Sequence, residues 1–149
     1  MHDKIKIPQT QIILAFVATC IEATARTLGV PYREVFLRMK RLGMIENYIY
    51  PNYGVLHTES RENIAHLMEQ TSENDPVKSP VIQDIIMSNR IGSISMELSR
   101  RLGITPTEAL MRFYESETCA NLHDRATGLY LFGDLYVADE YIRETTANK

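Results

Sequence analysis

The feature of this sequence that most restricts its fold is an internal repeat. The stretch from Arg26 to Ile45 returns 74 positions later, so that Leu28-Gly29-Val30 reappears as Leu102-Gly103-Ile104. Further matched pairs are Glu34 and Glu108, Arg38 and Arg112, Asn47 and Asn121, and Gly54 and Gly128. Because self-similarity at a fixed period redefines the structural unit, we predict two small lobes where length alone suggests one domain. Each lobe is small for independent stability, so we expect the two to pack together.

A polar segment marks the expected boundary between the lobes. Residues 71–80, Thr-Ser-Glu-Asn-Asp-Pro-Val-Lys-Ser-Pro, contain two prolines and no apolar periodicity, which is typical of a linker. We therefore assign residues 1–72 to the first helical repeat, 73–80 to the linker and 81–149 to the second helical repeat.

Apolar residues recur at helical spacing in both lobes. One stripe runs from Ile12 to Leu28 and a second from Ile82 to Leu102, and a glycine follows each, as is common at helix ends. A second helix then follows in each lobe, opened by Pro31 in the first and by a Thr105-Pro106-Thr107-Glu108 capping box in the second. The first of these is expected to bury Val35, Phe36, Met39 and Leu42.

The rest of each lobe is predicted to be a tyrosine-bearing loop and a final helix. Residues 46–60 and 118–127 contain turn formers and no helical period, and we interpret both as ordered loops. The closing helices are expected at residues 61–70 and from Asp134 to about Glu144. Strand candidates are Val55 to His57 and Leu129 to Phe132. The predicted fold class is mainly α, with two pseudo-repeated lobes of helix, helix, loop and helix and at most a short β ribbon.

The apolar segments and the net charge of the sequence predict where the protein is located and which partners it does not bind. The longest near-candidate for a membrane span, Ile12 to Ile21, is interrupted by Thr19 and is too short, and the start carries no signal-peptide pattern. We therefore expect a soluble cytoplasmic protein. A net charge of -3 disfavours non-specific binding to nucleic acid or to anionic membranes.

Motifs that would indicate catalysis are missing from the sequence. There is no HExxH, GxSxG, P-loop or GxGxxG pattern, and Cys20 and Cys119 lack CxxC spacing, so we expect two reduced thiols. The most distinctive histidine, His57, corresponds in the repeat to Leu131, which favours a packing role. We therefore predict no catalytic, cofactor-binding or metal-binding residue, and no enzymatic activity.

The remaining histidines and paired carboxylates are also interpreted as surface groups. His66 has no second metal ligand one turn away, and His123 lies beside Asp124 in an expected loop. Glu115 and Glu117 are two positions apart, so on a helix they point to different sides. A second alternative, an enzyme with a site between the lobes, stays open because sequence does not reveal such a cleft.

One helix also suggests nucleic-acid binding. Two helices joined through Leu-Gly-Val-Pro resemble a helix-turn-helix, and residues 26–41 hold five basic residues against one acidic, a local charge of +4. The residues that would contact DNA are Arg33, Arg38, Lys40 and Arg41. The equivalent helix of the second lobe carries Glu108, Glu115 and Glu117, whereas a duplicated DNA reader would keep its basic helix. A DNA-binding regulator is therefore the alternative and not the first choice.

Tyrosine-rich loops on a helical frame favour a protein-binding surface. Tyrosine and arginine dominate interface hot spots. The candidate partner-binding residues are Tyr48, Tyr50, Tyr53, His57, Arg38 and Arg41. The competing explanation is that the tyrosines only cover the small core.

Residues of both lobes carry resemblances to known families. In the first lobe they are Leu28-Gly29-Val30, Glu34-Val35, Arg38, Leu42-Gly43, Ile45, Tyr48-Ile49, Pro51, Tyr53 and Val55-Leu56-His57-Thr58. Through them the lobe resembles a family of short bacterial proteins classified as a domain of unknown function (number three-seven-nine-one). The second lobe resembles another set of small bacterial proteins, through Phe113-Tyr114, Ser116-Glu117-Thr118, Leu122, Asp124, Thr127-Gly128-Leu129-Tyr130, Tyr136, Tyr141 and Glu144.

These resemblances imply a role beside a partner protein. Proteins of this kind are encoded next to larger proteins that include ADP-ribosyltransferase-like domains, which implies an antitoxin-like or accessory role. The family supplies no catalytic residue. We therefore predict a non-catalytic protein-interaction module, antitoxin-like towards a neighbouring toxin or ADP-ribosyltransferase-like protein, with no cofactor.

Overall fold

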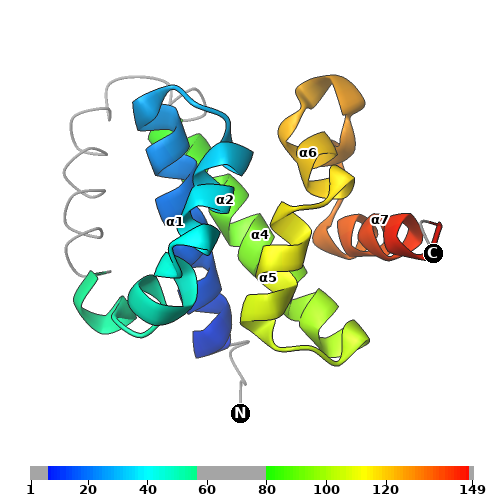
Figure 1. The fold of residues 1–149 in the computed structure, drawn as a ribbon. Helices are drawn as coiled ribbons and strands as arrows, with labels where there is room; N and C mark the ends of the chain where they lie inside the picture. Colours follow the sequence, from blue (N-terminus) through cyan, green and yellow to red (C-terminus); the bar gives the residue numbers. More distant parts are fainter. Residues whose placement is uncertain (1–6, 57–79, 148–149) are drawn as a thin grey trace, which may run out of the picture.

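A computed structural model describes residues 7–56 and 80–147 of the chain. Over these two ranges the chain forms helices and no strand, so the predicted mainly α fold class is confirmed (Figure 1). The elements in order are α1 (Gln9–Leu28), α2 (Tyr32–Arg41), the π-helix η1 (Ile45–Ile49), α4 (Pro80–Leu102), α5 (Pro106–Tyr114), α6 (Glu117–His123), the 3-10 turns η3 (Arg125–Thr127) and η4 (Leu129–Leu131), and α7 (Asp134–Ala147).

The helix ends lie where the sequence places them. Gly29 and Gly103, which follow α1 and α4, have φ values of 67° and 66°, a left-handed conformation that side chains disfavour. At the start of α5, the Thr105 hydroxyl oxygen accepts a hydrogen bond from the Glu108 amide at 3.2 Å. The helix, glycine and helix pattern is therefore present in both halves.

The centre of the molecule is the contact between α1 and α4, with α2 and α5 packed on the same pair (Figure 1). The approach is close at Gly92 of α4, where an added Cβ would lie 3.1 Å from the Ala15 nitrogen and from the Gln11 oxygen. The largest fully buried side chains around this contact are Tyr114, Phe36, Phe113, Leu14, Ile21, Ile45, Ile91, Ile94, Leu98, Leu110 and Leu122. The two halves of the chain therefore share one core.

Two segments predicted to be loops are helical, which corrects the prediction. The chain from Ile45 to Ile49 is a π-helix, and a helical turn follows in which the amides of Val55 and Leu56 donate to the Asn52 carbonyl at 3.1 and 3.0 Å. Residues 117–123 form α6, whose first turn is capped by the Ser116 side chain. The polar residues within these two segments were therefore misread as loop formers, although they lie in helical turns.

The β ribbon is also absent from the two described ranges. Val55 and Leu56 lie in the helical turn, and His57 lies outside the described residues. Leu129–Leu131 is a 3-10 turn, in which the Leu131 amide donates to the Gly128 carbonyl at 3.1 Å. Because these amides find acceptors within their own turn, they offer no edge for a paired strand.

Some residues of the predicted buried stripes face solvent, and two leucines are the most exposed of them among the described residues. Leu28 is 63% exposed and Leu42 is 66% exposed, although Val35, Phe36 and Met39 are buried as predicted. Each leucine precedes a left-handed glycine, Gly29 or Gly43, where the chain turns away and no described element covers the side chain. The expected inward position of both leucines was therefore wrong.

Some predictions concern residues outside the described ranges. These are the first lobe's closing helix at residues 61–70, His66 and the linker up to residue 79, whereas Pro80 already begins α4. The statement that the first apolar segment is too short for a membrane span needs correction: α1, with 20 residues, passes by length and composition. Core helices pass the same test, and Leu14, Val17, Ala18 and Ile21 of α1 are fully buried here.

Candidate functional site

A buried carboxylate lies where α1 meets the second half of the chain. Glu22, 7% exposed, sits on the core face of α1 between Ile21 and Ala25. Its Oε1 lies 2.8 Å from Nε2 of His123, at the end of α6, and its Oε2 accepts a hydrogen bond from the Tyr114 hydroxyl at 3.0 Å. A buried charge is tolerated when it is paired and hydrogen-bonded in this way.

The imidazole of His123 is held on both nitrogens and on one face. Its Nδ1 lies 2.8 Å from the carbonyl oxygen of Cys119, one turn earlier in α6, and the Tyr32 ring stacks on it with a centroid separation of 3.7 Å. Because both nitrogens face oxygen acceptors, the ring acts as a donor on both sides, which is its protonated form. Burial lowers the pKa of His123, but its interactions with Cys119 and Glu22 outweigh burial and raise the pKa to about 10.

This pair predicts a pH-dependent stability. Because the folded-state pKa of His123 lies above its ordinary value of 6.5, the stabilisation by the pair is complete below 6.5 and is lost as the pH rises through about 10. We expect the difference in free energy of unfolding between the wild type and a His123→Gln variant to shrink over that window, as measured by urea denaturation. A difference that stays constant or grows with pH would show that the imidazole is neutral in the folded protein.

The Cys119 thiol lies near this imidazole but is not an accessible nucleophile. Its Sγ is 3.7 Å from Nδ1 of His123 and the residue is fully buried. Burial raises the pKa of Cys119, so the thiol is protonated at neutral pH, whereas nucleophilic catalysis requires the thiolate. Within residues 7–56 and 80–147, no three His, Cys, Asp or Glu side chains are placed to hold a metal ion.

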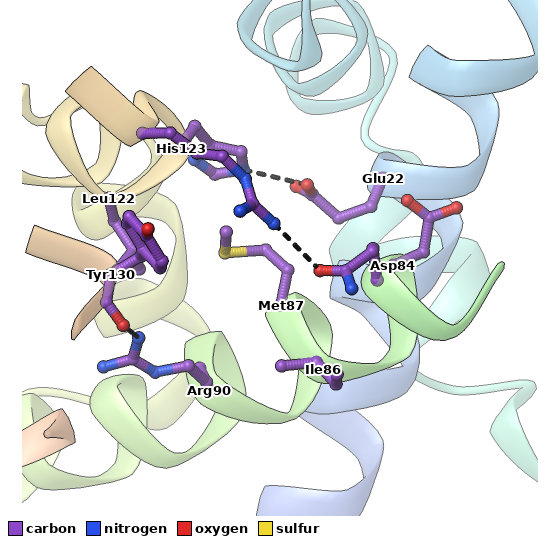
Figure 2. Close-up of a pocket in the computed structure, with 10 residues that line it drawn as sticks. Glu22, Asp84, Ile86, Met87, Arg90, Leu122, His123 and Tyr130 are labelled. Carbon is purple, nitrogen blue, oxygen red and sulfur yellow. Dashed lines mark hydrogen bonds and ion pairs between the residues drawn. The ribbon is translucent and has the colours of Figure 1, made fainter. Parts of the chain in front are cut away.

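Glu22 and His123 form one wall of a cavity of about 310 Å³ between α1, α4 and the segment from α6 to η4 (Figure 2). Helix α4 supplies the opposite wall, with Asp84, Met87 and Arg90. The complete lining is Glu22, Gln83, Asp84, Ile86, Met87, Arg90, Leu122, His123, Arg125 and Tyr130. We call this cavity the inter-half pocket, because each half of the chain contributes to it.

A second cavity, of about 400 Å³, lies between the end of α1 and the outer side of α2. The two exposed leucines, Leu28 and Leu42, line it together with Arg38. The other lining residues are Thr24, Val30, Glu34, Val35, Met39 and Met44. We call it the leucine groove, since apolar side chains dominate its walls.

The predicted partner-binding residues are divided between core and surface. Tyr53 packs edge-to-face on Phe16, with ring centroids 5.5 Å apart, and Tyr50 is half-buried against the core. Tyr48 is 52% exposed, and Arg38 and Arg41 are exposed on α2. Among the described candidates, Arg38 alone lines the leucine groove.

The four cations of the DNA-binding alternative do not form one free surface. Arg33 donates to the Ser116 carbonyl oxygen at 2.9 Å, and the Lys40 ammonium lies 2.5 Å from a carboxylate oxygen of Glu115. Both therefore bind the second half of the chain. Arg38 and Arg41 have no ion pair with any of the described residues.

The residues at the inter-half pocket were missed or misjudged from sequence. His123 was expected on the surface of a loop, but its side chain is 16% exposed and it ends a helix. Glu22 was not named as a candidate functional residue. The available signal was its position: a carboxylate inside the apolar stripe of α1 has to find a partner in the folded protein.

A comparison with known protein families gives a match for the first part of the chain. Residues 15–74 match a family described as "Protein of unknown function (DUF3791)", as the resemblance of the first lobe predicted. A comparison with curated proteins found no match, and neither did a comparison with solved structures.

Proposed function

We propose that this chain is a non-catalytic, cytoplasmic protein-interaction module whose leucine groove takes up an amphipathic helix of a partner protein. The observation that carries the proposal is the exposure of Leu28 and Leu42, 63% and 66%, on either side of a cavity of about 400 Å³. Apolar grooves between helices bind the apolar face of a partner helix through side chains one turn apart. Exposed apolar patches of this kind mark interaction sites on soluble proteins.

The charges beside the groove favour an acidic partner helix. Arg38 lies in the groove wall and Arg41 is exposed one turn further along α2, while Glu34 is the acidic residue of the lining. Neither arginine has an ion pair among the described residues, so carboxylates beside the apolar stripe of a partner would gain a cation each. The partner that the family resemblance implies, a neighbouring toxin or ADP-ribosyltransferase-like protein, is the first to test.

The absence of catalysis is part of the same proposal. The thiol at the centre of the molecule is fully buried and protonated, and its neighbouring imidazole is already engaged by Glu22 and by a carbonyl oxygen. The Glu22 carboxylate and the His123 imidazole are thus engaged with each other, and their contact joins α1 to α6. An antitoxin-like protein acts by binding and needs no nucleophile.

Substitution of the two leucines tests the groove. We expect the Leu28→Asp/Leu42→Asp variant to bind the neighbouring protein at least about 100-fold more weakly in isothermal titration calorimetry, because both side chains would be central anchors. As a matched control, Leu131→Asp/Leu135→Asp replaces leucines that are 73% and 61% exposed on the other half of the chain.

The outcome separates three cases. If the control variant binds as the wild type does and the groove variant loses affinity at an unchanged melting temperature, the groove is the binding surface. Equal affinities of wild type and groove variant would place the interface elsewhere. If the wild type itself does not bind the neighbouring protein in the calorimeter or on co-expression, that partner assignment is wrong.

A further inference from the structure

We infer that the partner helix in the leucine groove is an acidic helix with the apolar pattern of α7, which covers the equivalent surface of the second half. This inference rests on the proposed function and adds to it the kind of helix that fits the groove. The second half of the chain supplies the evidence, because its counterpart of the groove already holds a helix.

The repeat of 74 positions relates the helices of the two halves as well as their sequences. Shifted by 74, the bounds of α2, Tyr32–Arg41, become 106–115, and α5 is Pro106–Tyr114. The same shift carries η1, Ile45–Ile49, onto residues 119–123 of α6. Each residue of the leucine groove therefore has a counterpart in the second half.

Helix α7 lies on the counterpart of the groove, where it packs against α4 and α6 (Figure 1). Its Tyr141 ring meets the Phe113 ring of α5, with centroids 6.1 Å apart. Its Glu144 carboxylate accepts hydrogen bonds from the amide and the hydroxyl of Thr118 at 2.9 and 2.6 Å. Phe113 and Thr118 each stand 74 positions after a methionine that lines the leucine groove.

The exposures of matched side chains agree with this cover. Leu42 of the groove is 66% exposed, whereas its counterpart Ser116 is 6% exposed. Leu28 is 63% exposed, whereas its counterpart Leu102 is 38% exposed. Because removal of apolar surface from water is favourable, the leucine groove would be stabilised by a helix placed as α7 is placed in the second half.

The inner face of α7 gives the apolar pattern of such a helix. Val137 and Ala138 are fully buried, Tyr141 is 5% exposed, and Ile142 is partly buried against the core. The four residues occupy positions i, i+1, i+4 and i+5, which lie on one face of a helix. A partner helix with large or small apolar residues at this spacing would fill the groove between Leu28 and Leu42.

The charges beside the groove favour an acidic form of this helix. Helix α7 carries four carboxylates against one guanidinium. Burial raises the pKa of the Tyr141 hydroxyl, and the charges of Arg112 and Glu115 on α5 also act on it, so both lie near this side chain. Their counterparts on α2 are Arg38 and Arg41, so that a cation replaces a carboxylate. Carboxylates of an α7-like helix would therefore meet two guanidinium groups that have no ion pair among the described residues.

The test uses the full-length protein and a peptide with the sequence of α7, Asp134–Ala147. A covalent staple between the exposed positions 135 and 139 keeps this short peptide helical. We expect it to bind in isothermal titration calorimetry with a Kd below about 100 μM. Ala138→Asp/Tyr141→Asp in the peptide should weaken binding at least about tenfold, whereas Arg143→Gln, on its exposed side, should not weaken it.

Variants of the protein locate the bound peptide. Leu28→Asp/Leu42→Asp and Arg38→Glu/Arg41→Glu should each bind the peptide at least about tenfold more weakly, and the control Leu131→Asp/Leu135→Asp should bind as the wild type does. No binding to the wild type at about 1 mM peptide would overturn the inference. Equal affinities of the wild type and Leu28→Asp/Leu42→Asp would overturn it too, because the peptide would then bind outside the groove.

The neighbouring protein, titrated into the same variants, decides the proposed function separately. If it loses affinity for Leu28→Asp/Leu42→Asp while the peptide does not bind the wild type, the groove is the partner surface and the α7 pattern is wrong. If the peptide binds the groove and the neighbouring protein does not, the pattern holds and that partner is wrong.

One further variant tests whether the chain supplies its own helix. Ile64, Leu67 and Met68 stand 74 positions before Ala138, Tyr141 and Ile142, so they repeat part of the α7 pattern in the sequence. We expect Ile64→Asp/Leu67→Asp to bind the peptide as the wild type does. Binding at least about tenfold tighter would show that this segment of the chain competes for the groove, and would overturn its assignment to a partner helix.

Discussion

Replacement of Glu22 by alanine is expected to destabilise the protein by about 3–5 kcal/mol, because it breaks a buried ion pair from one side. The variant leaves the His123 imidazolium without its carboxylate and the Tyr114 hydroxyl without its acceptor, and both groups are buried or nearly so. An uncompensated buried charge costs more than the intact pair contributes. Urea denaturation should show the loss of free energy of unfolding. Thermal denaturation should show a melting temperature lowered by roughly 6–20 °C.

Two comparison variants separate the charge from the packing. Glu46→Ala removes an exposed carboxylate from η1 and should change stability by no more than about 0.5 kcal/mol. The triple variant Glu22→Leu/His123→Leu/Tyr114→Phe removes all three polar partners at similar volume and should be more stable than Glu22→Ala. A loss below about 1 kcal/mol for Glu22→Ala would mean that water reaches the pair and that the cluster is not a buried ionic centre.

The sequence predicted those parts of the fold that depend on neighbouring residues. The two long stripes, the glycines at 29 and 103 and the Thr105 cap each need only a few adjacent positions, and all of them lie where predicted. The same local reasoning failed at Ser116. Residues 118–127 were interpreted as a loop, but the Ser116 side chain accepts from the Cys119 amide and begins α6, which runs to His123.

The pocket depends on contacts that no local pattern encodes. Glu22 and His123 are 101 positions apart, and they meet because α1 packs against α4 and α5, and α5 leads directly into α6. With residues 118–127 interpreted as a loop, nothing in the sequence directed the His123 side chain inwards. A rule that every charged residue within an apolar stripe has a buried partner would have identified Glu22, although it would not have named His123.

The leucine groove also could not be predicted from local sequence patterns. Periodicity assigned Leu28 and Leu42 to the buried faces of their helices, and their neighbours on the same faces are buried. Whether the last residue of a stripe is covered depends on where the next element runs, and both leucines stand at a glycine where the chain changes direction. The residues on which the proposed function depends are thus among those at which helical periodicity gave the wrong answer.

Replacement of Gly92 by leucine is expected to cost about 3 kcal/mol or more, because α1 and α4 are in contact at this position. An added Cβ would lie 3.1 Å from two backbone atoms of α1 and 3.2 Å from the Ala15 Cβ, and a leucine adds three further carbons in the same direction. Backbone atoms do not move aside as flexible side chains do, so the two helices would have to separate. Since both halves of the core rest on this contact, the whole molecule should unfold at lower urea.

The Gly92→Ala variant tests the effect of a smaller side chain on stability at the same position. Gly92→Ala gains about 1 kcal/mol of helix propensity and loses a similar amount to overpacking, so its net effect should be within about 1 kcal/mol of the wild type. Asn89→Leu, which adds a large side chain at an exposed position of the same helix, should be nearly neutral. Ala15→Gly should rescue Gly92→Leu only in part, because the clash with the α1 backbone remains. Full rescue, or a Gly92→Leu variant as stable as Asn89→Leu, would show that α4 does not approach α1 as closely as the structure has it.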